Sequence, residues 1–140
     1  MPAPVIYYIR HGETPWNAEG RLQGAQDIPL NELGRRQAAH AGDVLAGLLA
    51  REGRDTSALP FVASPLLRAR ATMELVRSSL ELPPHQYALD DRLREIRYGV
   101  WEGSTLAEMQ AADPVLYARR LTAKWTMAPE GGETYAEVQA

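Results

Sequence analysis

The sequence contains no cysteine among its 140 residues. This absence excludes disulfides, thiolate zinc sites and cysteine nucleophiles. Only one of the 15 basic residues is a lysine, and the formal net charge is −3 with no block of one sign. Because binding to nucleic acid or to a membrane surface needs a basic patch, we expect neither partner.

Long apolar runs are also absent, and no segment approaches the length that spans a membrane. The first ten residues lack the basic-then-apolar order of a signal peptide, so we expect a cytoplasmic protein. Aromatic residues make up only 7% of the chain, whereas hydrophobic residues reach 45%. Aliphatic side chains must therefore fill most of the core of what we interpret as a single domain over residues 1–140.

Three short runs predict strands. Residues 5–9 are rich in β-branched and aromatic side chains and predict a buried strand, and residues 60–63 and 87–89 predict two more. Helical patterns alternate with these runs, which predicts an α/β protein with a mostly parallel sheet. Ligands bind such sheets where the strands end, and Arg10-His11-Gly12 directly follows the first run.

Four helical segments connect or follow the strands. Asn31 can cap a helix that runs to about Glu52. Ser64-Pro65 fits an N-cap followed by a first-turn proline, and Pro83-Pro84 would stop that second helix. Two further segments lie at about 106–112 and 115–124. The apolar stripes are Ala38, Ala41, Leu45 and Leu48 on the first helix, and Leu67, Ala71 and Leu75 with Val76 beside them on the second.

The last residues show an interrupted pattern. Thr134-x-x-Glu137 matches a capping box, which opens a helix, yet few residues remain before Ala140. So short a helix cannot stabilise itself. Two interpretations follow with equal weight: the chain is cut just after a helix begins, or its terminus frays.

Two clusters have side chains suited to phosphate chemistry. A strand would hold His11 rigidly, Arg10 adds a fixed cation, and Gly12 lets an anion approach the backbone. A neutral imidazole can attack phosphorus while arginines offset charge on the oxygens. The second cluster is Arg68 and Arg70 near the start of a helix, where cations oppose the helix dipole unless an anion is bound. We assign Arg68 to function and Arg70 to the solvated surface.

The motifs form an ordered set along nearly the whole chain. They are Arg10-His11-Gly12-Glu13-Thr14 with Asn17, Gly20-Arg21-Leu22-Gln23-Gly24, Asp27-Ile28-Pro29-Leu30 with Gly34, Ser64-Pro65-Leu66-x-Arg68-Ala69-x-x-Thr72, Leu93-x-Glu95-Ile96, Tyr98-Gly99-x-Trp101-Glu102-Gly103 and Pro129-x-Gly131-Gly132-Glu133-Thr134. Each piece is weak alone, but the set in this order resembles the histidine phosphatase superfamily, which includes the phosphoglycerate mutases.

The resemblance implies a phosphoglycerate mutase-like fold, a three-layer sandwich with a mostly parallel sheet flanked by helices. It also implies that His11 is the phosphorylated nucleophile and that Arg10 and Arg68 clamp the phosphoryl group. Glu95 would protonate the leaving oxygen and then activate water. The substrate side would be lined by Asn17, Arg21, Gln23 and Gly24.

The chain departs from the family at one place. The family has a second active-site histidine, in a His-Gly pair at the end of a later strand. Neither His40, mid-helix among alanines, nor His85, in a loop after two prolines, fits that pattern. Together with the interrupted helix, this predicts a C-terminally truncated domain that lacks its last strand and helix. The lost strand is expected beside the first one, so a homodimer that covers the open edge is a further hypothesis.

Two activities of the family compete. Mutases typically carry a Gly-Leu-Asn-Lys run after the Tyr-Gly motif, whereas this chain continues with Val100-Trp101-Glu102-Gly103 and a short stretch to Pro129. Both features resemble the phosphatase branch. We therefore expect hydrolysis of a small phosphorylated substrate without metal or cofactor, since no Asp-x-Asp or His-x-His spacing indicates a metal. The alternatives are a phosphoglycerate mutase and an inactive chain that only binds phosphate-containing ligands.

Overall fold

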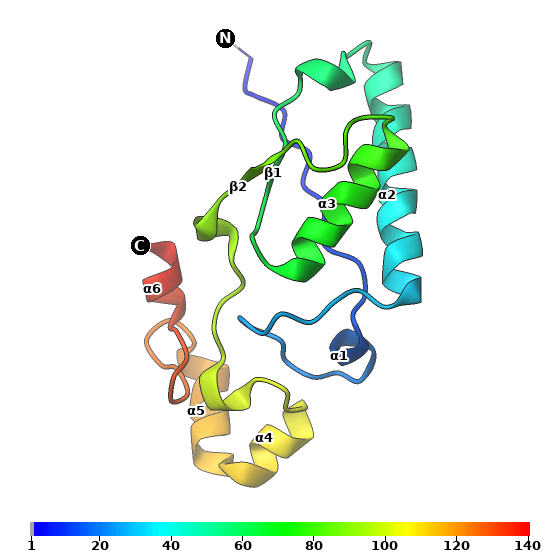
Figure 1. Cartoon of the computed structure of the whole chain (residues 1–140). Coiled ribbons are helices and arrows are strands. Elements are labelled where there is room, and N and C mark those ends of the chain that lie inside the picture. The colour runs from blue at the N-terminus through cyan, green and yellow to red at the C-terminus, as the bar shows by residue number, and fades with distance from the viewer. Residues whose placement is uncertain (1) are drawn as a thin grey trace.

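The computed structural model describes residues 2–140 (Figure 1). In chain order the elements are α1 (Pro15–Ala18), α2 (Glu32–Arg51), η1 (Thr56–Ala58), β1 (Val62–Ala63), α3 (Leu67–Ser79), β2 (Ala88–Leu89), η2 (Asp91–Leu93), η3 (Gly99–Trp101), α4 (Leu106–Ala112), α5 (Pro114–Ala123) and α6 (Tyr135–Gln139). The elements marked η are short 3-10 helices. None of the helices in this range is both long and apolar enough to cross a membrane.

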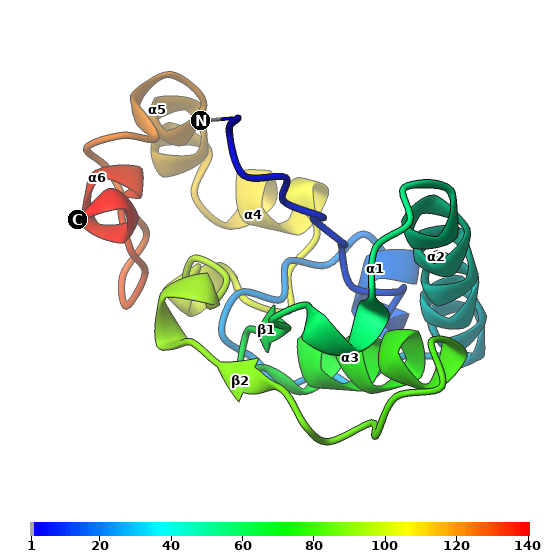
Figure 2. The ribbon, with the colours of Figure 1, turned by 90° about the horizontal axis from the view of Figure 1, so that it is seen from above.

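The sheet consists of β1 and β2, which run parallel. Val62 pairs with Ala88 and Ala63 with Leu89. The crossover between them is α3, which packs along α2, so that the two helices lie side by side in both views (Figures 1 and 2). The predicted α/β class, with helices beside a parallel sheet, is therefore confirmed.

The predicted buried strand at residues 5–9 is wrong. This segment has no strand assignment, and Ile6 and Tyr8 are 81% and 89% exposed. Only the alternate residues Tyr7 and Ile9 pack against the core. A strand needs backbone partners, and within residues 2–140 no backbone hydrogen bond joins this segment to another. The side chains of this segment alternate between exposed and partly buried, as in a strand, but its backbone makes no inter-strand hydrogen bonds within residues 2–140.

The core lies between α2 and α3. Leu45 and Leu49 of the first helix meet Val76 and Leu80 at the second. Burial of each such side chain contributes about 1.5–3 kcal/mol. Asn31 caps α2 as predicted, through its Oδ1 and the amide of Gly34 at 2.8 Å. The predicted stripe missed Leu49, which is fully buried.

The start of α3 differs from the prediction. The helix begins two residues after the predicted N-cap pair, and its N-cap residue, Leu66, supplies no side-chain hydrogen bond. Instead, the amide of Leu67 donates to Oδ1 of Asp27 at 2.7 Å. A carboxylate from a distant loop thus satisfies an orphan amide of the first turn. The inward face also differs: Leu67 is exposed, whereas Arg68 and Thr72 are buried. Val76 is buried as predicted.

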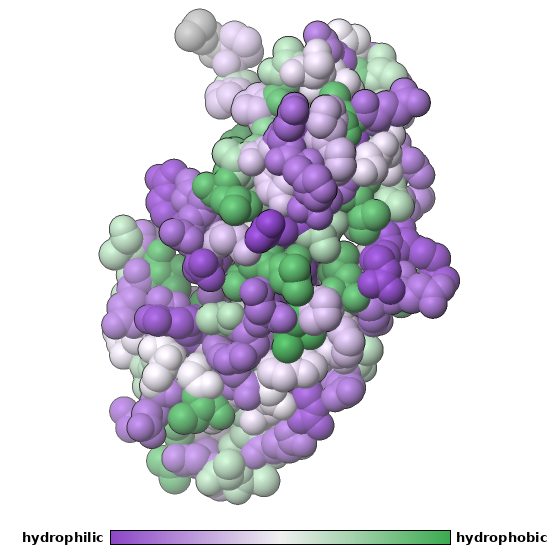
Figure 3. All heavy atoms as spheres, in the orientation of Figure 1, coloured by the Kyte–Doolittle hydropathy of each residue, from purple (hydrophilic) through white to green (hydrophobic). Residues whose placement is uncertain are grey.

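The last third of the chain forms a smaller helical unit. In Figure 2, α4, α5 and α6 lie away from α2 and α3. The predicted helices at about 106–112 and 115–124 are confirmed, as is the capping box that opens α6. The amides of Tyr135 and Ala136 donate to the carbonyls of Lys124 and Trp125, directly after α5, which fixes α6 there. Figure 3 shows hydrophobic side chains across the middle of this face of the molecule, between the two groups of helices.

One arginine anchors this unit. Arg120 of α5 is only 8% exposed, and its guanidinium carbon lies 5.5 Å from the ring centroids of Tyr98 and Tyr135 and 6.0 Å from that of Trp101. These cation–π contacts join α5 to η3 and α6. They offset part of the cost of the Arg120 Nε atom, which is buried without a hydrogen-bond partner among the described residues.

Candidate active site

The loop that carries His11 is fixed by two helices. The amide of Gly12 donates to Oγ1 of Thr72 on α3 at 3.1 Å, and Thr72 in turn donates to the carbonyl of Arg68 at 2.8 Å. On the other side the loop touches the first turn of α2. A Cβ atom on Gly12 would lie 2.1 Å from the carbonyl oxygen of Gly34, so only glycine fits at this position.

His11 is half-buried, and one ring nitrogen has a defined partner. Its Nδ1 lies 2.7 Å from the carbonyl oxygen of Gly12. Because a carbonyl only accepts, the neutral ring must carry its proton on Nδ1, which leaves the lone pair on Nε2. Burial is the largest influence on the ring and lowers its pKa below the ordinary value. The neutral, nucleophilic form is therefore favoured near pH 7.

The charges around His11 come from separate segments of the chain. The guanidinium groups of Arg68 and Arg10 add to the lowering of the His11 pKa, while the carboxylate of Glu95 opposes it. These three predicted residues and His11 are thus close enough to interact electrostatically. Arg10 is exposed and makes no hydrogen bond or ion pair with residues 2–140. Glu95 is also exposed, and one of its carboxylate oxygens accepts the amide of Ile96.

Arg68 is the most deeply buried charge of the cluster, with 1% of its surface exposed. Its Nη1 and Nη2 donate to the carbonyls of Gln26 and Gly24, both at 2.8 Å. Burial lowers the pKa of Arg68, and the carboxylates of Glu95, Asp27 and Glu102 act against this. The guanidinium stays charged, because arginine does not lose its proton in proteins. Two of its donors are held by a loop, which orients the group.

Asn17 and Gln23 meet around one hydroxyl. Thr14 is fully buried and caps α1, where its amide donates to Oδ1 of Asn17 and its Oγ1 accepts the Asn17 amide. The same hydroxyl donates to Oε1 of Gln23, which is also buried. Both predicted substrate residues are therefore held by Thr14, three residues after His11.

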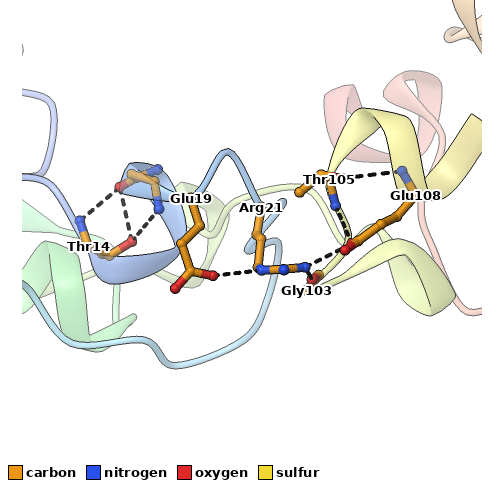
Figure 4. Close-up of polar contacts among 7 residues, drawn as sticks. Thr14, Glu19, Arg21, Gly103, Thr105 and Glu108 are labelled. Atoms are coloured by element: carbon orange, nitrogen blue, oxygen red, sulfur yellow. Dashed lines mark hydrogen bonds and ion pairs between the residues drawn. The ribbon is translucent and has the colours of Figure 1, made fainter.

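Arg21 has different surroundings from Arg68. Its Nε lies 2.7 Å from Oε2 of Glu19, and its Nη1 lies 2.7 Å from the carbonyl of Gly103 and 2.8 Å from Oε2 of Glu108 (Figure 4). Two carboxylates thus neutralise its charge, and the side chain ties the loop after α1 to the start of α4. The assignment of Arg21 to substrate binding stays a prediction, and these contacts favour a structural role.

Three residues have roles at the site that sequence reasoning missed. Thr72 holds Gly12, Asp27 caps α3, and Glu102 binds the loop that orients Arg68. A signal existed for Thr72, which follows Arg68 by four residues and so shares its helix face. Asp27 and Glu102 act on partners about 40 to 80 residues away, which no local pattern reveals.

The other two histidines lie outside this cluster. His40 is exposed on α2, and His85 is an exposed loop residue whose Nδ1 lies 3.2 Å from Oε1 of Glu74. Neither contributes to the electrostatic surroundings of His11. The site thus combines one neutral imidazole, two guanidiniums and one carboxylate, a set suited to transfer of a phosphoryl group.

Known proteins show the same combination of fold and sequence. The sequence profile described as histidine phosphatase superfamily (branch 1) matches residues 6–140. The glucosyl-3-phosphoglycerate phosphatase of Mycolicibacterium vanbaalenii is 39% identical over 134 residues, which cover 95% of this chain and 54% of that protein. The uncharacterized phosphatase PhoE of Bacillus subtilis is 41% identical over 103 residues, covering 74% of this chain and 48% of that one.

A solved structure agrees with the fold. The mycobacterial glucosyl-3-phosphoglycerate phosphatase in complex with VO3 superposes with a TM-score of 0.72 at 36% identity, covering 91% of this chain and 58% of that one. The chain spans about half the length of the two relatives named above.

Proposed function

Because the chain belongs to the histidine phosphatase superfamily (branch 1), we propose that it hydrolyses phosphomonoesters through a phosphohistidine on His11. The observation that carries this proposal is the state of His11. Its Nδ1 hydrogen bond leaves Nε2 with the lone pair, and burial with two nearby guanidiniums keeps the ring neutral. A neutral imidazole beside guanidinium cations is an arrangement suited to attack on phosphorus.

In the first step, Nε2 of His11 forms a bond to phosphorus as the bond to the ester oxygen breaks. Glu95 gives its proton to the leaving oxygen, which departs as an alcohol. In the second step, Glu95 takes a proton from water, and the resulting hydroxide attacks the phosphohistidine. The products are inorganic phosphate, free His11 and protonated Glu95.

Arg68 and Arg10 would stabilise charge in both steps. The phosphoryl group carries negative charge on its three outer oxygens in the transition state. Arg68 is held by two backbone carbonyls before any substrate arrives, so its charge needs little reorganisation. Arg10 is exposed and free to turn toward the phosphoryl group. Asn17, Gln23 and Gly24 would line the substrate side of the same site.

The substrate is expected to be a small phosphorylated molecule. Two of the proteins compared above are named as glucosyl-3-phosphoglycerate phosphatases, so glucosyl-3-phosphoglycerate is the first substrate to test. A cytoplasmic location and a homodimer stay predictions. Analytical ultracentrifugation tests the dimer, and a monomer that persists at all protein concentrations would contradict it.

One observation favours a second candidate function, which is binding of phosphate-containing ligands without turnover. The family's second active-site histidine has no counterpart in His40 or His85, since neither lies beside His11. Arg68 and His11 do not depend on that residue for their own placement. Such a chain would bind phosphate-containing ligands but would not hydrolyse them.

The deciding experiment measures hydrolysis of an aryl phosphate with EDTA present, together with the affinity for orthovanadate. His11→Ala is the test variant, and His40→Ala is the matched control because that histidine is exposed on α2. Turnover that His11→Ala abolishes and His40→Ala retains would support the phosphatase. Vanadate binding without turnover would support the binding function instead. Conversion of phosphoglycerate isomers without net hydrolysis would reveal a mutase.

A further inference from the structure

Glu102 accepts hydrogen bonds from two separate segments. Its Oε1 accepts the amide of Ala25 at 3.0 Å and the amide of Tyr98 at 3.1 Å. Its Oε2 accepts from Nε2 of Gln26 at 2.8 Å. The half-buried carboxylate thus joins the loop 24–26 to the end of the segment that carries Glu95.

The loop is shaped to receive this carboxylate. Gly24 has φ +53°, a left-handed conformation that favours glycine. A Cβ atom at position 24 would lie 2.3 Å from Oε1 of Glu102. The backbone of the loop therefore packs directly onto the Glu102 side chain, with no room for another group between them.

The other side of this loop holds Arg68. The carbonyls of Gly24 and Gln26 accept hydrogen bonds from its two terminal nitrogens. In the same turn, Glu102 accepts from the backbone amide of Ala25 and the side-chain amide of Gln26. The amide of Gln26 closes this turn on the carbonyl of Gln23 at 3.0 Å, and the amide of Ala25 is held by Glu102. The direction of the loop carbonyls depends on what holds the loop amides.

We propose that Glu102 is a positioning residue that orients Arg68 through the loop 24–26. Through the amide of Tyr98, it also holds the segment that carries Glu95 next to this loop. This inference rests on the proposed phosphate-binding role of Arg68. Glu102 does not itself touch the phosphoryl group in this scheme. Its effect travels by hydrogen bonds: from its carboxylate to the loop amides, and from the loop carbonyls to the guanidinium.

Three variants separate this role from a general loss of stability. Glu102→Ala removes all of the hydrogen bonds. Glu102→Gln keeps an oxygen for the two backbone amides, but it loses the charge and places an NH₂ group opposite Nε2 of Gln26, whose exposed side chain can turn away. Glu108→Ala is the matched control, because Glu108 also binds the neighbouring loop, through Arg21, but has no link to Arg68. Thermal unfolding of each variant reports its stability.

The first readout is ¹⁵N NMR of the Arg68 guanidinium, assigned by its absence in Arg68→Lys. Hydrogen bonds to two carbonyls hinder its rotation, so the terminal NH₂ groups should give separate signals in the wild type. We expect these signals to persist in Glu102→Gln and Glu108→Ala and to merge in Glu102→Ala. The second readout is the affinity for orthovanadate, which should fall about 10-fold or more in Glu102→Ala and within about 3-fold in Glu102→Gln.

Separate Arg68 signals and unchanged vanadate affinity in Glu102→Ala would overturn the inference. So would equal losses in Glu102→Gln and Glu102→Ala, because charge rather than position would then explain them. If Glu102→Ala does not fold, Glu102→Asp replaces it, since the shorter side chain keeps the charge but cannot reach both segments. A wild type that shows separate Arg68 signals but binds no vanadate would refute the proposed function alone, and the NMR comparison would still decide the role of Glu102.

Discussion

Gly34 and Gly47 both lie in α2, and alanine at these two positions should have opposite effects on stability. At Gly34 a Cβ atom would lie 2.0 Å from the carbonyl oxygen and 2.7 Å from the amide nitrogen of Glu13. Ordinary contact begins near 3.5 Å, so the Glu13 backbone must retreat by about 1 Å or more. At Gly47 nothing lies within 4 Å of the new atom.

The expected magnitudes follow from these distances. Gly34→Ala should lower the free energy of unfolding by about 2–4 kcal/mol, because overpacking costs about 1–3 kcal/mol and the retreat weakens a hydrogen bond worth about 1 kcal/mol. That bond joins the Asn31 amide to the Glu13 carbonyl at 3.0 Å. Gly47→Ala should raise the free energy of unfolding by about 0.5–1 kcal/mol, since alanine is the better helix former.

Urea denaturation followed by tryptophan fluorescence and far-UV circular dichroism measures both changes. A midpoint for Gly34→Ala at or above that of Gly47→Ala would refute the reasoning. Because Glu13 follows His11 by two residues, Gly34→Ala should also move the imidazole NMR signals of His11. Gly47→Ala should leave those signals unchanged.

The remaining predictions concern single side chains. The pKa of His11, measured by NMR titration, should lie below 6.5, so this group weakens the fold progressively as pH falls from about 6.5 through its lower folded pKa. Arg10→Gln should raise that pKa, and an unchanged value would show that Arg10 does not act on the ring. Arg120→Ala should lower the free energy of unfolding by about 2 kcal/mol, because the packing of the guanidinium on three aromatic rings is lost. In the control Arg119→Ala, which removes an exposed neighbour, the loss should be about 0.5 kcal/mol or less. Equal losses in the two variants would contradict this reasoning. Thr72→Val should cost about 1–3 kcal/mol in denaturation experiments by leaving a buried amide after His11 unpaired, whereas Thr72→Ser keeps the hydroxyl and should recover most of it. A valine variant as stable as the serine variant would show that this hydrogen bond contributes little.

Local patterns predicted the helices well. Asn31 caps α2, and the apolar residues of this helix recur at helical spacing up to its observed end. Both features were readable from the sequence because capping and periodicity involve residues only a few positions apart. The predicted strand at residues 5–9 was wrong, because composition shows which residues suit a strand but not whether a neighbouring strand pairs with them. The capping box of α6 could likewise be predicted from the sequence, because Thr134 and Glu137 lie within one helical turn of each other.

The inward face of α3 shows why part of the site was hidden. An apolar stripe at Leu67 predicted the wrong face, because the buried side of the first turns carries Arg68 and Thr72. A hydrophobicity pattern places arginine and threonine at the surface. In the structure, Arg68 and Thr72 are buried because they donate hydrogen bonds to backbone carbonyls. Arg10, His11 and Arg68 were singled out from their own local patterns, and Glu95 through the family motifs. The supporting contacts of Glu102 span more than 70 residues and had no local signature.

The cap that Asp27 provides to α3 has a consequence for the order of folding. A helix of 13 residues is marginal in isolation, and the side chain that satisfies its first amide lies 40 positions earlier in the chain. The first turn of α3 therefore gains its cap only after loop 24–27 has docked. Since Arg68 stands in that turn, the charged site should assemble late in folding and open early when the loop detaches. In hydrogen exchange, the amide of Leu67 should lose protection together with the loop and before the amides of the buried α2–α3 core.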